Sequence, residues 1–195
     1  MYDMLHAGYS NDPVEEKHRL SKLGYEKDME LSQKKDRVYV HKDTKQAYVV
    51  HRGTNPMDPA DLATDVALGL GAQKYTPRFR KAKRLTAKTQ KKYGKENTIA
   101  MGHSLGGAIA TESGADKRIT YNRGVGLGHV GRKTKKGQVD YRTNGDAVSF
   151  LSKTTRYEKG AQRHTIPSRQ RKKGESHGSY ALDSHHLEWL KHSST

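Results

Sequence analysis

The sequence predicts an α/β fold, in which a mostly parallel sheet is flanked by helices and carries an antiparallel hairpin at its edge. Two β-rich runs at residues 37–41 and 47–51, joined by a polar stretch, predict the hairpin. From residue 77 onward, strand-like and helix-like segments alternate, which is typical of parallel strands joined by crossover helices. A short apolar run at residues 98–101 leads through a glycine-rich turn into helix-compatible residues 108–113, which indicates a buried parallel strand followed by a helix.

Three segments before the strand at residues 98–101 have helical patterns. Residues 12–33 carry apolar side chains among charges and are expected to be helical, with a break near Gly24. Residues 58–68 predict a short helix. Residues 77–93 predict a longer, basic helix that leads into the strand.

The second half of the chain continues the alternation. Residues 118–122 and 138–142 predict two more strands, and another short strand is expected around residues 164–166. A short helix at residues 183–191 is expected to end the fold.

Length and composition limit the class of protein. The 195 residues predict a single domain (1–195), with a core over about residues 37–191 and an N-terminal helical segment at residues 1–36. The chain has no cysteine, which excludes disulfides and thiolate chemistry, and no motif in it calls for a cofactor or a metal. We see neither a signal-peptide pattern nor a segment long enough to span a bilayer, so a soluble protein is expected.

The charge of the chain is strongly basic and unevenly distributed. The 37 Lys and Arg residues against 21 acidic ones give a formal charge of +16, and residues 66–95 contain no acidic residue. A second basic cluster lies within residues 163–173. Such a charge attracts anionic phospholipid, nucleic acid or an acidic partner. The chain has no nucleic-acid-binding motif, and a basic surface that only maintains solubility is the simpler alternative.

Residues 102–107, Gly-His-Ser-Leu-Gly-Gly, predict chemistry most directly. They fit the G-x-S-x-G pattern of a nucleophile elbow, a sharp turn between a strand and a helix. Glycines let the backbone crowd this turn, so that the Ser104 hydroxyl projects from the sheet and the Leu105 N–H points into the site. Ser104 is therefore the expected nucleophile, and His103, which precedes it, is expected either to pack behind it or to support the residues that act in the site.

A serine nucleophile requires a histidine base and an acid that orients the histidine. Asp146 follows the strand predicted at residues 138–142, at the edge where an open α/β sheet places its site, and the chain order serine, acid, histidine fits an elbow. Its alternative role is that of a turn residue after Asn144 and Gly145. Asp140 and Asp116 are the competing acids, but the first lies within a predicted strand and the second follows the elbow helix too closely.

The base is expected among the histidines downstream of Asp146. His185 and His186 precede the apolar residues 187–190, which could hold a histidine loop against the core. His164 fits a strand and His192 a chain end. Two adjacent histidines cannot easily present both rings to one ion, and no carboxylate accompanies them at ligand spacing, so metal binding is not expected.

The tetrahedral intermediate of such a reaction needs an oxyanion hole with two donors. One is the N–H of Leu105, and Thr54 fits the second because it follows the strand at residues 47–51 and offers both an N–H and a hydroxyl.

These motifs resemble, in order, those of the class 3 lipases, the fungal-type triacylglycerol lipase family of α/β-hydrolases. The similarity extends over most of residues 38–190. Its motifs lie at residues 49–54, 61–65, 102–107, 144–148 and 185–187.

The resemblance implies an α/β-hydrolase domain that acts on a lipid or another carboxylic ester. It implies Ser104 as nucleophile, Asp146 as acid and Thr54 as oxyanion residue. Two forms of the C-terminal motif fit, one selecting His185 and the other His186, and His185 is preferred. Little sequence separates residue 68 from the basic helix, so no apolar lid is expected.

Two alternatives concern a cofactor site and a non-catalytic function. Residues 126–131 match G-x-G-x-x-G, but a basic turn follows where a dinucleotide site requires a helix, so no nucleotide cofactor is expected. The rival function is a catalytically inactive hydrolase fold whose charge binds nucleic acid or anionic surfaces. Covalent labelling of an activated serine distinguishes an enzyme from such a protein.

Overall fold

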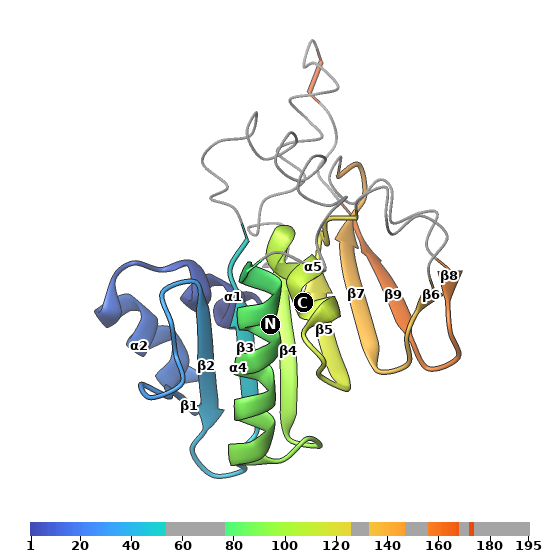
Figure 1. Cartoon of the computed structure of the whole chain (residues 1–195). Helices are drawn as coiled ribbons and strands as arrows, with labels where there is room; N and C mark the ends of the chain where they lie inside the picture. Colours follow the sequence, from blue (N-terminus) through green and yellow to red (C-terminus); the bar gives the residue numbers. More distant parts are fainter. Residues whose placement is uncertain (54–76, 126–132, 147–155, 168–171, 174–195) are drawn as a thin grey trace.

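The computed structural model describes residues 1–53, 77–125, 133–146, 156–167 and 172–173. Its centre is a seven-stranded sheet in the order β1-β2-β3-β4-β5-β7-β9 (Figure 1). The strands are β1 (Tyr25–Lys27), β2 (Asp36–His41), β3 (Ala47–His51), β4 (Thr98–His103), β5 (Lys117–Tyr121), β7 (Gln138–Thr143) and β9 (Gln162–Ile166).

Five neighbouring strands of this sheet, from β3 to β9, are parallel, whereas β1 and β2 pair antiparallel at one edge. The predicted α/β class and the edge hairpin are therefore confirmed. Parallel strands end at the same side of a sheet, so the residues that follow β3, β4, β5 and β7 converge on one edge. This is the upper edge in Figure 1.

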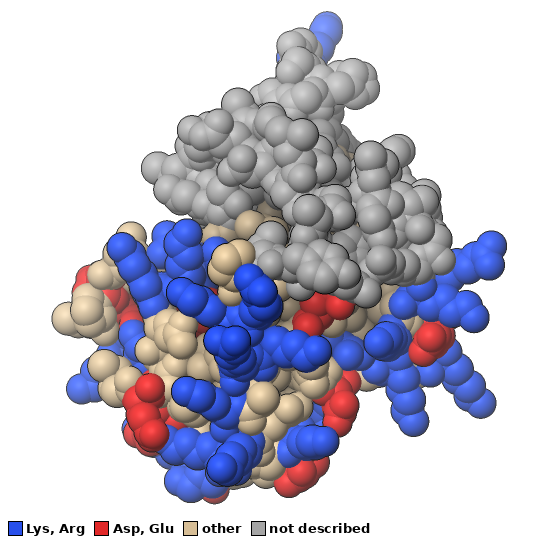
Figure 2. Space-filling view, in the orientation of Figure 1, with Lys and Arg blue, Asp and Glu red and all other residues tan. Residues whose placement is uncertain are grey.

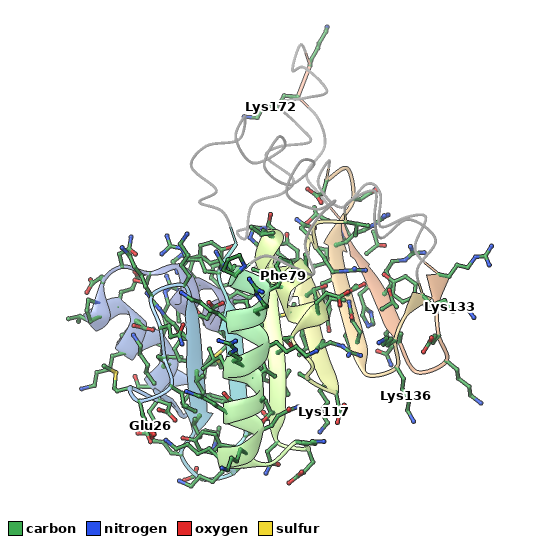
Figure 3. The ribbon with its side chains drawn as sticks, viewed as in Figure 1. Glu26, Phe79, Lys117, Lys133, Lys136 and Lys172 are labelled. Atoms are coloured by element: carbon green, nitrogen blue, oxygen red, sulfur yellow. The ribbon has the colours of Figure 1, made fainter. Side chains whose placement is uncertain are left out.

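Helices cover both faces of the sheet. On one face lie α4 (Pro77–Tyr93) and α5 (Leu105–Glu112), and Phe79 packs against Ile109 to join them. Figure 3 shows Phe79 near the upper end of α4. On the other face, α1 (Tyr2–Tyr9) buries Leu5 with the β-strand residues Val50 and Met101.

The N-terminal region differs from its predicted form. The helix expected over residues 12–33 is wrong beyond α2 (Pro13–Lys22), and β1 follows where the helix should continue. Gly24 has a φ of 76°, a left-handed conformation that turns the chain out of the helix. Tyr25 then packs edge-on against His41 and Tyr48, so the sheet supplies contacts that the local pattern did not indicate.

The other predicted strands and the basic helix are confirmed within a residue or two. The structure adds a small parallel pair, β6 (Lys133–Thr134) and β8 (Arg156–Tyr157), that the sequence did not indicate. The helices predicted at residues 58–68 and 183–191 lie outside the described residues. Among the helices that are described, none is sufficiently long and apolar to cross a bilayer.

Candidate active site

The site begins where β4 ends. Ser104 follows β4 directly, and Asp146 follows β7 after a short turn whose Asp146 N–H bonds to the Thr143 carbonyl at 3.3 Å. Only β5 separates these two strands, so the ends of β4 and β7 are roughly 10 Å apart, two strand spacings. The structure therefore brings the predicted nucleophile and acid to the same edge.

Ser104 has the backbone of a sharp elbow. Its φ of 56° and ψ of −125° lie outside the regions that non-glycine residues normally occupy. The turn is possible because a Cβ on Gly102 would overlap the Gly106 carbonyl, and a Cβ on Gly106 would overlap the His51 carbonyl. The two glycines of the G-x-S-x-G motif are thus required by close backbone packing.

Backbone hydrogen bonds hold the elbow in place. The Ser104 N–H donates to the Tyr121 carbonyl at 3.1 Å, and the Ser104 carbonyl accepts from Gly107, Ala108 and Gly124 at 3.0–3.2 Å. The Oγ, in contrast, is buried and has no hydrogen-bond partner among the described residues. A fixed backbone with an uncommitted hydroxyl suits a nucleophile that waits for a base and a substrate.

The predicted oxyanion hole is described in part. Leu105 is the first residue of α5, and its N–H belongs to the amides that a helix leaves without internal partners. Gly53 lies directly against the elbow, because a Cβ there would come within 2.7 Å of the His103 carbonyl. The chain therefore passes the elbow at Gly53, but Thr54 itself lies outside the described residues.

Tyr9, on α1, supports this region and was missed from the sequence. Its hydroxyl accepts the Gly53 N–H at 2.8 Å and lies 3.2 Å from the His103 Nδ1. Burial raises the pKa of Tyr9 to about 12, so the hydroxyl remains protonated at neutral pH. The His103 ring also stacks on Tyr121, which confirms its packing role behind the nucleophile. No local pattern could reveal Tyr9, because its partners are distant in sequence.

The competing acid Asp140 is fully occupied. Its carboxylate accepts hydrogen bonds from Thr120 (2.5 Å), Gln138 (2.7 Å), Tyr157 (2.7 Å) and Arg123 (3.0 Å). Burial alone would raise the pKa of Asp140, but the Arg123 charge and these hydrogen bonds outweigh it and hold the pKa below its usual value. Asp140 is therefore the acceptor at the centre of a buried polar network beside the site.

The other competitor, Asp116, lies at the wrong end of the sheet. It directly precedes Lys117, the first residue of β5, which Figure 3 labels at the lower edge. Asp146 is buried, at 5 % exposure, on the same edge as Ser104. Of the three acids considered, the geometry leaves Asp146 as the one both near the nucleophile and outside the Asp140 network.

The predicted bases His185 and His186 lie outside the described residues. Of the predicted triad, only Ser104 and Asp146 therefore lie among the described residues. In the part of the chain that is described, no group of three His, Cys, Asp or Glu residues could hold a metal ion.

Comparison with known proteins adds one match. The model of a phospholipase-like family, described as the Tle-like phospholipase domain, matches residues 2–180. Comparisons with curated proteins and with solved structures gave no match. The match includes the strands, the elbow and Asp146, and it corresponds to a lipase or phospholipase family without selecting the class 3 lipases. The chain belongs to the phospholipase-like family of Tle-like phospholipase domains.

Proposed function

We propose that the protein is a serine hydrolase that cleaves a carboxylic ester of a phospholipid through an acyl-enzyme. The observation that carries the proposal is the elbow, which holds Ser104 at a positive φ at the carboxyl edge of the sheet, with its hydroxyl unbonded by any described residue. The family match supports a lipid ester as substrate. The resemblance to class 3 lipases supports the same roles for the same residues.

The reaction proceeds in two steps. The Ser104 Oγ attacks the ester carbonyl while its proton passes to the imidazole of His185 or His186, which Asp146 orients. The Leu105 N–H and Thr54 stabilise the oxyanion, and the intermediate collapses as the imidazolium gives its proton to the departing alcohol. Water, deprotonated by the same histidine, then attacks the acyl-enzyme, releases the fatty acid and restores the Ser104 hydroxyl.

The basic surface supports contact with an anionic membrane. On α4, every basic residue from Arg80 to Lys92 is exposed, and Figure 2 shows lysine and arginine side chains gathered over this helix. Lys92 alone of these forms described ion pairs, with Asp28 and Glu30. A positive helix face attracts anionic phospholipid headgroups, which places the enzyme at its substrate. Nucleic acid remains the alternative polyanion, and no described motif favours it.

Ester hydrolysis by a Ser104→Ala variant tests the proposed nucleophile. We expect hydrolysis of short p-nitrophenyl esters and of phospholipid to fall by about three or more orders of magnitude, because the acyl-enzyme cannot form. The matched control is Ser21→Ala, whose hydroxyl only bonds the His18 carbonyl on α2. Thermal unfolding should show that both variants fold. Turnover by folded Ser104→Ala at the rate of the unmodified protein would contradict the proposal.

A further inference from the structure

Arg142, near the carboxyl end of β7, is half-buried and has two guanidinium nitrogens that lack a partner among the described residues. Its Nε and one Nη are inaccessible to solvent, and neither has a hydrogen-bond partner among the described residues. An arginine side chain is always charged, and burial of a charge without a partner is costly. Such a group in a native fold calls for an explanation, and a bound ion is one of the few available.

Among the described residues, no carboxylate forms an ion pair with Arg142. Pairing of β7 with β9 places Arg163 beside Asp140, on the same sheet face as Arg142. Asp140 already accepts its hydrogen bonds from other residues, including Arg123, and Arg163 forms no ion pair with a described residue. This face of the sheet therefore carries more positive than negative charge close to Arg142.

The electrostatic environment of Arg142 agrees with this arrangement. Burial, followed by the charge of Arg163, lowers the pKa of the Arg142 guanidinium, while Asp146 acts in the opposite direction. Asp146 thus lies near enough to interact, but no Arg142–Asp146 salt bridge forms. Arg163 is held in place over the Tyr157 ring, with its guanidinium carbon 5.2 Å from the ring centre.

Arg142 also lies close to the reacting edge. It follows Tyr141, whose carbonyl accepts the Asn122 N–H at 2.9 Å, and the neighbouring Tyr121 carbonyl accepts the Ser104 N–H at 3.1 Å. Two adjacent hydrogen bonds therefore connect the backbone of Arg142 to that of the nucleophile. The Arg142 side chain therefore starts at the same edge of the sheet as Ser104.

We propose that Arg142, supported by Arg163, binds the phosphate of the phospholipid substrate while Ser104 attacks its acyl ester. The phosphate is joined to the scissile ester only through the glycerol backbone, so both groups fit one site. Guanidinium N–H groups match phosphate oxygens in geometry and charge. The inference rests on the proposed function and extends it, because it explains why a phospholipid would be cleaved in preference to a neutral glyceride.

The expected preference for phospholipid over diacylglycerol arises from the Arg142 guanidinium, which a substrate without phosphate leaves unpaired. A diacylglycerol with the same acyl chains offers the same ester but no anion, so its binding leaves the two buried guanidinium nitrogens unpaired. Sites built around a buried polar group reject ligands that lack its partner far more strongly than apolar pockets reject a changed methylene.

The test compares kcat/KM for a monomeric short-chain phosphatidylcholine with that for the diacylglycerol carrying the same acyl chains. Monomeric substrates remove any contribution from binding to a membrane surface. We expect the phospholipid-to-diacylglycerol ratio to fall about 10- to 100-fold in Arg142→Gln and less in Arg142→Lys, which keeps the charge. Arg156→Gln, an exposed arginine on β8, is the matched control and should keep the original ratio.

Direct binding of inorganic phosphate, measured by calorimetry, gives a readout that does not depend on catalysis. The unmodified protein should bind phosphate more tightly than Arg142→Gln, with Arg156→Gln equal to the unmodified protein. Equal phosphate binding by Arg142→Gln, or an unchanged substrate ratio in it, overturns the phosphate site. If the unmodified protein hydrolyses no ester, the proposed function is overturned instead. The comparison of phosphate binding still decides the role of Arg142 in that case.

Discussion

The elbow at Ser104 depends on neighbouring glycines, which have no Cβ atom. Gly102 packs against Gly106 of α5, and Gly106 in turn packs against the carbonyl of His51 at the end of β3. The end of β3, the end of β4 and the start of α5 thus meet through backbone atoms. The positive φ of Ser104 is maintained by this packing and by the hydrogen bonds of its carbonyl.

Substitution of the elbow glycines should therefore have graded effects. Gly106→Ala places a methyl group on the His51 carbonyl, which cannot move without shifting β3, so we expect a loss of about 1–3 kcal/mol or more in the free energy of unfolding. Gly107→Ala is the milder comparison, because its Cβ would lie 3.2 Å from backbone atoms of Gly102 and Arg123, so a small shift suffices and offsets part of the about 1 kcal/mol that alanine gains in helix propensity. Urea unfolding measures both. Equal stability of the two variants would show that the close packing at residue 106 is not required.

At the scale of single elements, one face of α4 packs on the core and the opposite face presents positive charge to solvent. Its apolar residues Phe79, Ala82 and Leu85 face the sheet, and its exposed face carries the basic residues. Among these, Arg80, Lys81 and Arg84 lie in the half of the helix nearer the active-site edge. This half is expected to contact the membrane first.

Removal of these charges should weaken binding to anionic vesicles. A triple variant with Gln at Arg80, Lys81 and Arg84 loses roughly 1 kcal/mol per residue near an anionic surface, so affinity should fall about 100-fold. Binding by the unmodified protein should itself weaken steeply above ~0.3 M salt, because the Debye length is then about half its value at 0.1 M. A variant with Gln at Lys133, Lys135 and Lys136, at the β6 turn, is the control. Vesicle sedimentation measures the affinities.

Two outcomes would contradict this role of α4. One is equal binding of the unmodified protein to neutral and anionic vesicles, which would indicate that the charge serves solubility. The other is displacement from vesicles by small amounts of nucleic acid, with tighter binding to the nucleic acid itself.

The same scale shows what the sequence could and could not reveal. Residues 98–112 were predictable because strand, turn and helix are encoded locally by an apolar run and by glycines. In contrast, β1 is only three residues long, and its strand conformation comes from pairing with β2 and from contacts of Tyr25. For α1, the sequence predicted a helical segment over residues 1–36 but not the separate helix at its start, which packs on the core through Leu5.

The candidate site divides in the same way. Positions relative to the predicted strands were enough to select Ser104 and to reject Asp140. The structure adds the physical reason for rejecting Asp140, whose carboxylate already accepts several hydrogen bonds. The roles of Tyr9 and Arg142 depend on which segments meet in space and on which buried atoms remain unpaired. A single sequence does not contain that information in any local pattern.

At the scale of the whole molecule, buried tyrosines make stability sensitive to alkaline pH. Burial raises the pKa of Tyr9, Tyr25 and Tyr157 to about 12. Burial likewise raises the pKa values of Tyr39 and Tyr121 above that of an exposed tyrosine. The fold therefore favours the protonated forms, and an unfolded chain would lose these protons near pH 10.

The sign of the effect follows from this difference. The stabilising contribution is complete below about pH 10 and is lost progressively as the pH rises toward about 12, since the unfolded state then releases protons that the folded state retains. We expect the free energy of urea unfolding to fall across this interval, with tyrosinate absorbance rising together with unfolding. Full tyrosine ionisation near pH 10 in a protein that remains folded would contradict the burial of these side chains.

The central claim, that Ser104 is an activated nucleophile, is tested most directly by covalent labelling. A fluorophosphonate probe reacts with a serine only where a base and an oxyanion hole activate it. Peptide mass spectrometry after labelling should find the phosphonyl group on Ser104, and Ser104→Ala should remain unlabelled while Ser21→Ala is labelled like the unmodified protein. A folded protein that takes up no label, or that takes it up on another serine, would contradict the account.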